Sequence, residues 1–168
     1  MNRGGIVARV KGQLIQITKE QKGNVTIARI VGIIDESAKF DALLTPLPKE
    51  LHIMCKEIPR ISSAGVKAWM KAFQDIQTKK IPVKLIECSS SLVEQINWIS
   101  NFTCGATVES VMCPYNCSKC KSDFVATNKC VDIKAKNFEL PDLICPKCKS
   151  AAVFDDQPEE YFQFLMRK

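Results

Sequence analysis

Hydrophobic positions in the first two thirds of the chain follow two periodicities, that of a strand and that of a helix. Residues 13–18 and 25–32 are rich in Val and Ile. They flank a Lys-Gly-Asn turn at residues 22–24, and this arrangement predicts a β-hairpin. The compact apolar runs 51–55 and 83–88 have the length of interior strands, and both are expected in the same sheet.

Two longer segments repeat apolar residues at steps of three and four, the spacing of an amphipathic helix. The first begins near Ser63 and reaches Lys80, and its apolar stripe consists of Val66, Trp69, Met70, Phe73 and Ile76. The second begins at a capping box made by Ser91 and Glu94. Its apolar face consists of Leu92, Val93, Ile96 and Ile99.

A short helix is expected between the hairpin and residues 51–55. Asp35 or Ser37 can cap it, Pro46 and Pro48 end it, and its apolar face consists of Phe40, Leu43 and Leu44. A last strand is expected at residues 108–112. Strands that alternate with helices after a hairpin predict an α/β fold with a mixed sheet over residues 1–112.

Two motifs in this region resemble those of a STAS domain, the fold of bacterial anti-sigma factor antagonists. Residues 25–35 read VTIARIVGIID, and Gly32 and Asp35 stand where the family has a glycine and an Asp that opens its first helix. The turn at residues 62–66, SSAGV, stands where the family has Asp-Ser-Ser/Thr-Gly-Leu before its second helix. The resemblance covers about residues 12–112, the length of one small domain.

The resemblance implies a non-enzymatic signalling module that contacts a protein partner, an anti-sigma factor or a kinase-like regulator. Ser63 matches the serine that partner-switching antagonists present for phosphorylation, and Gly65 matches the turn glycine. Ser62 replaces the acidic residue of the family, and Ala64 replaces its second hydroxyl. A serine between a strand and a helix is also a common N-cap, and this is the structural alternative for Ser63.

Six of the nine cysteines lie within the last third of the chain. Two Cys-x-x-Cys motifs with 24 residues between them predict a closed Cys₄ zinc site in a zinc ribbon, formed by Cys117, Cys120, Cys145 and Cys148. An iron–sulfur cluster and a redox dithiol are the alternatives. Cys113 and Cys130 also lie nearby, and both are expected to be packing residues of the module.

The ribbon module is expected to span residues 113–168, with short strands at 124–127, 131–133 and 151–154. Its tail places an acidic stretch before a short aromatic helix formed by Tyr161, Phe162, Leu165 and Met166. These side chains are expected to dock on the ribbon or on the first domain, and a partner-binding face is the alternative. The only histidine, His52, lies in a predicted strand, and we expect it to be structural.

The formal net charge is +6, and its distribution along the chain bears on whether the protein binds nucleic acid or another protein. Residues 1–112 carry 15 Lys and Arg against 10 Asp and Glu, whereas residues 113–168 carry 9 against 8. A ribbon with four thiolates and one divalent zinc would become slightly negative, which makes a phosphate-binding interface unlikely for it. A nucleic-acid-binding ribbon is therefore the second candidate, behind a protein-interaction module.

No apolar run approaches the roughly 20 residues that span a membrane, and the apolar stretch after the N-terminus is too short for a signal peptide. The cysteine pattern is also typical of metal binding in a reducing compartment. These features predict a cytoplasmic protein, and they leave its oligomeric state open.

Overall fold

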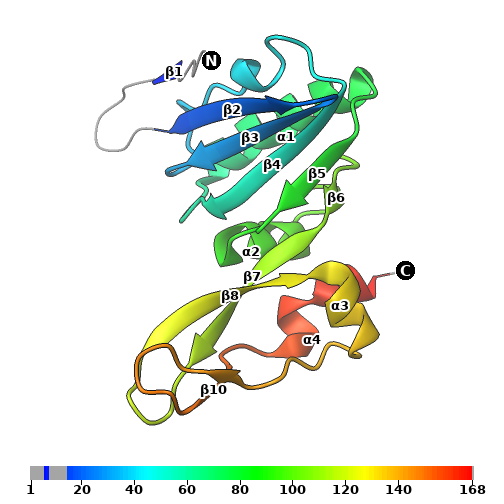
Figure 1. The fold of residues 1–168 in the computed structure, drawn as a ribbon. Helices are drawn as coiled ribbons and strands as arrows, with labels where there is room; N and C mark the ends of the chain where they lie inside the picture. Colours follow the sequence, from blue (N-terminus) through cyan, green and yellow to red (C-terminus); the bar gives the residue numbers. More distant parts are fainter. Residues whose placement is uncertain (1–5, 8–14, 168) are drawn as a thin grey trace.

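The computed structural model describes residues 6–7 and 15–167, and these residues form two sheets (Figure 1). The first sheet has six strands that follow one another in chain order. They are β1 (Ile6–Val7), β2 (Gln16–Lys22), β3 (Val25–Val31), β4 (Glu50–Glu57), β5 (Val83–Ile86) and β6 (Thr107–Val108). Residues 13 and 14 of the predicted first strand lie outside the described residues.

The strands β1, β2 and β3 pair antiparallel, and the pairs from β3 to β6 are parallel. The predicted mixed α/β sheet is therefore confirmed. Helix α1 (Ser63–Thr78) connects β4 to β5, and α2 (Ser90–Trp98) follows β5. In Figure 1 the long helix α1 lies along one face of the sheet.

Trp69 is the centre of the apolar layer between α1 and the sheet. Its indole ring stacks on Phe73 at 4.1 Å and on Phe102 at 5.5 Å between ring centroids, and Phe40 meets it edge-on. All four aromatic rings are buried. Aromatic pairs in these geometries stabilise a core beyond their area burial. The predicted helical stripe is thus confirmed as core packing.

The cap of α2 differs from the predicted capping box. Ser89 is the N-cap, and its side chain accepts the amide of Leu92 at 3.4 Å. Ser91 is the second residue of the helix, and its hydroxyl donates to the Pro59 carbonyl at 2.6 Å. Three consecutive serines offer several cap positions, and Ser89, which has an extended backbone, is the one that caps the helix.

The expected short helix before Pro46 is only one 3₁₀ turn, η1 (Asp41–Leu43). Neither Asp35 nor Ser37 caps it. Instead, Asp35 accepts the amide and the hydroxyl of Ser37 at 2.9 and 2.5 Å, which closes a local turn. These hydrogen bonds, the hydroxyl first, lower the pKa of the Asp35 carboxyl below 3.8.

The second sheet has the strand order β8–β7–β10–β9. Its strands are β7 (Ser110–Asn116), β8 (Asp123–Lys129), β9 (Leu143–Ile144) and β10 (Ala151–Phe154). The predicted boundary between residues 112 and 113 falls inside β7. This strand also forms a parallel bridge from Val111 to Cys88, so one continuous strand belongs to both parts of the fold.

Residues 131–133, predicted as a strand, lie in a short helix, α3 (Cys130–Ala135). The alternating pattern was misleading because Val131 is 66% exposed and only Ile133 is buried. The tail forms two further short helices, α4 (Pro158–Tyr161) and α5 (Gln163–Met166). Tyr161 and Phe162 are buried, which confirms that the tail docks on the fold.

Within the part of the chain that the structure describes, no helix combines the length and the apolar character that crossing a membrane requires.

Candidate metal centre and interaction turn

The four predicted thiols meet at one end of the second sheet. Their Sγ atoms all lie within 4.8 Å of one another. Cys117 Sγ lies 3.4 Å from Cys148 Sγ, and Cys120 Sγ lies 3.6 Å from Cys145 Sγ. A tetrahedral zinc with Zn–S bonds of ~2.3 Å has S–S edges of about 3.8 Å. The cluster therefore has the size and the donor set of a Cys₄ metal site.

The two halves of the site share one sequence and one backbone conformation. Residues 117–122 and 145–150 both read Cys-x-Lys-Cys-Lys-Ser. In each half the amide of the first cysteine donates to the serine carbonyl, at 3.1 and 2.8 Å. In each half the second lysine donates its amide back to the carbonyl of the first cysteine, at 2.8 and 3.0 Å.

Both of these lysines, Lys121 and Lys149, have a left-handed backbone with φ of 56° and 63°. That conformation costs a non-glycine residue roughly 1–2 kcal/mol. The two Cys-x-x-Cys turns therefore share the same strained backbone position.

Backbone donors give the thiols unequal acidity. The Cys148 amide, and after it the Ser122 hydroxyl, hold the pKa of the Cys145 thiol at about 6. The Ser150 amide lowers the pKa of Cys148. At Cys117 the Cys120 amide lowers the pKa, but desolvation and the Cys148 thiol raise it to about 11. Metal binding at neutral pH therefore has to release the Cys117 proton.

Ser122 is a residue of the site that the sequence pattern did not single out. Its hydroxyl lies 2.7 Å from Cys120 Sγ and 3.6 Å from Cys145 Sγ, so it contacts one thiol from each Cys-x-x-Cys turn. Hydrogen bonds to ligand atoms from such residues orient the ligands of metal sites. The six-residue repeat Cys-x-Lys-Cys-Lys-Ser is the sequence signal that identifies this serine.

Cys113 and Cys130 lie outside the four-thiol cluster. Both are buried, and burial is the main reason that the pKa of each thiol is raised to about 12. Protonated, desolvated thiols of this kind behave as small apolar side chains. The structure thus places them among the packing residues, in agreement with the spacing argument.

The turn before α1 brings Ser62, Ser63 and Gly65 together, but with different roles from those expected. Ser62 is the N-cap, and its Oγ accepts the Gly65 amide at 3.0 Å. Ser63 is the first residue of the helix and is exposed. Its hydroxyl makes no hydrogen bond to another described residue. The suggestion that Ser63 caps the helix is therefore wrong.

Gly65 is required at its position by close packing. A Cβ atom there would lie 2.1 Å from the Ile34 carbonyl oxygen, far inside contact distance. The Ser62 amide donates to the same oxygen at 2.9 Å. The start of α1 is thus pressed against the turn that follows β3, which keeps Ser63 in a defined position.

Three turns meet at the carboxyl edge of the parallel strands. The turn after β3 pairs with the turn after β4 through the Ile34–Ile61 bridge. Ser91, at the start of α2, reaches the turn after β4 through Pro59. The carboxyl ends of parallel strands are the usual place for function in α/β folds. Ser63 lies on the surface that these turns form.

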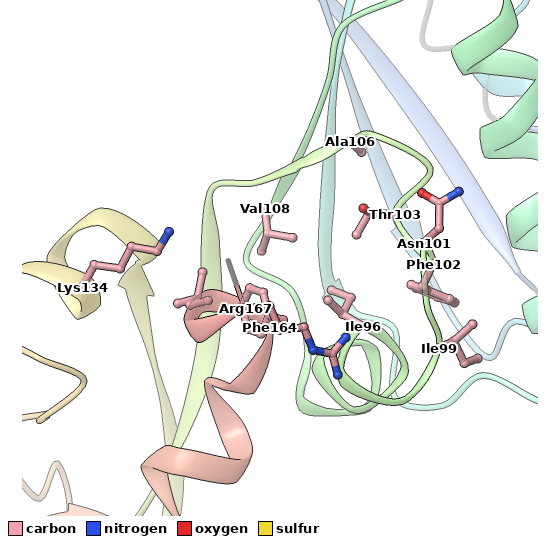
Figure 2. A pocket seen from close by; sticks show the side chains of 11 residues that line it. Ile96, Ile99, Asn101, Phe102, Thr103, Ala106, Val108, Lys134, Phe164 and Arg167 are labelled. Carbon is pink, nitrogen blue, oxygen red and sulfur yellow. The ribbon is translucent and has the colours of Figure 1, made fainter.

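A separate cavity of about 360 Å³ lies between α2, the loop that follows it, and α5 (Figure 2). Its lining combines apolar side chains, Ile96, Phe102 and Phe164 among them, with the polar side chains of Asn101 and Thr103. Lys134 and Arg167 contribute its only charged side chains within the described chain. None of the described residues that line the cavity is a cysteine, a serine or an acid, so these residues supply no thiol or serine nucleophile and no carboxylate base.

His52 lies in β4, far along the chain from the four thiols. Its Nε2 is 2.7 Å from Glu50 Oε1, two residues earlier on the same strand face. This local pair is consistent with a structural role.

No protein-family model matches this sequence, and comparison with curated proteins finds no match.

Proposed function

We propose that this protein is a non-enzymatic regulatory protein of bacterial signalling, built from a STAS-like domain and a zinc ribbon. Its first domain acts through protein–protein contact, with an anti-sigma factor or a kinase-like regulator as the class of partner. The observation that carries the proposal is the exposed Ser63 hydroxyl at the start of a 16-residue helix.

The position of Ser63 suits a regulated contact. Ser62 supplies the cap, so the Ser63 hydroxyl has no structural task. A phosphate on this hydroxyl would lie at the positive end of the α1 dipole, where negative charge is stabilised. It would also add negative charge to the surface formed by the three turns, so a bound partner would meet a changed surface.

Zinc is the metal proposed for the four thiols. Four thiolate donors in two turns of the same form are the donor set of structural zinc sites. Such a site leaves no open coordination position, so the metal would stabilise the second sheet and would not activate water. The ribbon then serves as a rigid extension of the first domain.

The test is affinity capture from the native cell with the full chain as bait, in three forms: unchanged, Ser63→Asp and Ser63→Ala. We expect Ser63→Asp to change the amount of at least one captured protein, and mass spectrometry of the endogenous protein to find phosphate on Ser63. Ser100→Asp is the matched control, because Ser100 is also exposed but lies in the turn just after α2.

Identical captured proteins for the unchanged chain and Ser63→Asp would contradict the proposed role of this serine. The same experiment on chelator-treated protein separates the two parts of the proposal. Loss of the partner only after metal removal would assign the contact to the ribbon.

A further inference from the structure

Strand β8 is a long sheet edge that the described part of the chain leaves open. Three of the four outermost strands, β1, β6 and β9, are only two residues long. The fourth, β8, has seven residues and no proline. Short or interrupted edges are a common protection against pairing with other chains, and β8 lacks it. The edge of β8 is therefore a candidate site for pairing with another strand.

The backbone groups that β8 offers can be assigned from its pairing with β7. The Cys117 amide donates to the Ser122 carbonyl, and the Cys130 amide donates to the Glu109 carbonyl. Ser122 and Cys130 flank β8, and both pairs continue its antiparallel register with β7. The hydrogen-bonded pairs of this ladder therefore fall on the even-numbered residues of β8. Because hydrogen-bonded pairs alternate along an antiparallel ladder, the odd-numbered residues point their N–H and C=O groups away from β7.

These outward groups belong to Asp123, Val125 and Thr127. No other described backbone group pairs with them. Their side chains and that of Lys129 are exposed, and Val125 keeps 54% of its surface accessible. The edge thus combines free hydrogen-bonding groups with an apolar side chain.

The exposed residues of β8 are complementary to themselves in one antiparallel register. With a two-fold axis at Ala126, Asp123 of one copy lies opposite Lys129 of the other, and Val125 lies opposite Thr127. Opposite charges and β-branched residues in facing positions stabilise strand pairs. Moving the axis to Val125 instead places Lys129 opposite Lys121, so the charges select the first register.

We propose that two copies of this chain pair through β8, antiparallel about a two-fold axis at Ala126. The two ribbons then form one continuous sheet of eight strands, with an Asp123–Lys129 ion pair at each end of the new interface. This proposal does not depend on the proposed signalling role.

Charge exchange tests the register. The metal-loaded full chain is measured by sedimentation equilibrium, where the unchanged protein should reach twice the 18.8 kDa chain mass. Asp123→Lys places like charges at both ends of the interface and should raise the dimer dissociation constant about tenfold. The double variant Asp123→Lys with Lys129→Asp should restore the original constant.

A backbone variant tests the edge itself. Val125→Pro removes an N–H that points away from β7, so the ribbon keeps its own ladder while the new interface loses hydrogen bonds. It should be monomeric at concentrations where the unchanged chain is dimeric. Its metal content should equal that of the unchanged chain, which shows that the ribbon is folded. Asp142→Lys is the matched charge control, because Asp142 is exposed and lies outside β8.

Two results would overturn the proposal. One is a monomeric unchanged chain at about 100 μM, a concentration that would reveal even a weak dimer. The other is a dimer that persists in both Asp123→Lys and folded Val125→Pro.

Discussion

The side-chain amide of Asn97 in α2 donates to the Tyr161 carbonyl oxygen at the end of α4, 3.1 Å away. The same amide reaches the Glu160 carbonyl at 3.0 Å, and its oxygen accepts the Phe164 amide at 2.9 Å. Asn97 is buried, so these bonds replace water. One polar side chain therefore binds the C-terminal helices to the first domain.

Asn97→Ala should lower the free energy of unfolding by about 2–3 kcal/mol, because it leaves buried backbone groups without partners. Urea denaturation measures the loss. Glu94→Ala, an exposed change in the same helix, should have almost no effect. Equal stability of the two variants would show that the tail docks by apolar contact alone.

The proposed zinc site predicts about one zinc per chain. Cys120→Ser should abolish stoichiometric zinc binding and unfold the ribbon, because a structural site supplies much of the folding energy of a small module. Elemental analysis and circular dichroism measure both effects. Cys130→Ala should keep its zinc, since Cys130 lies outside the cluster. Zinc loss in both variants would mean that the ligand set is wrong.

The two serines before α1 should respond differently to the same change. Ser62→Ala removes the cap and should cost about 1 kcal/mol of stability. Ser63→Ala removes an exposed hydroxyl and should change stability by less than about 0.5 kcal/mol. Thermal unfolding of the two variants makes the comparison. A larger loss at Ser63 would contradict the assignment of Ser62 as the cap.

Gly65→Ala should destabilise the first domain by roughly 3 kcal/mol or more, because the new Cβ would overlap the Ile34 carbonyl. Denaturant unfolding measures this loss. Ala64→Gly, the reverse exchange at the neighbouring exposed position, should cost only about 1 kcal/mol through helix propensity. If Gly65→Ala were the milder change, the close contact between α1 and the Ile34 turn would not exist in solution.

The local pattern was sufficient for the main elements and for the four-thiol cluster. The hydrophobic period predicted the stripe of α1 correctly, because Trp69 and Phe73 on that stripe are both buried. The thiol pairs were predictable because a Cys-x-x-Cys turn is a local structure. Its two sulfurs are close before any tertiary contact forms.

Features that depend on how segments meet were not predictable in this way. Three serines in a row allowed several caps for α2, and only the structure shows that Ser89 is the cap. Residues 131–133 alternate like a strand, yet β8 ends at Lys129 and the chain turns into α3.

The sequence by itself determined the mixed α/β class, the apolar stripe of α1 and the identity of the four thiols, because each follows from short-range periodicity or spacing. Only the tertiary structure decided that β7 belongs to both parts of the fold and that β8 is an open edge. It also decided that Ser62, and not Ser63, caps α1. These depend on which backbone groups find partners, and those partners lie far away along the chain.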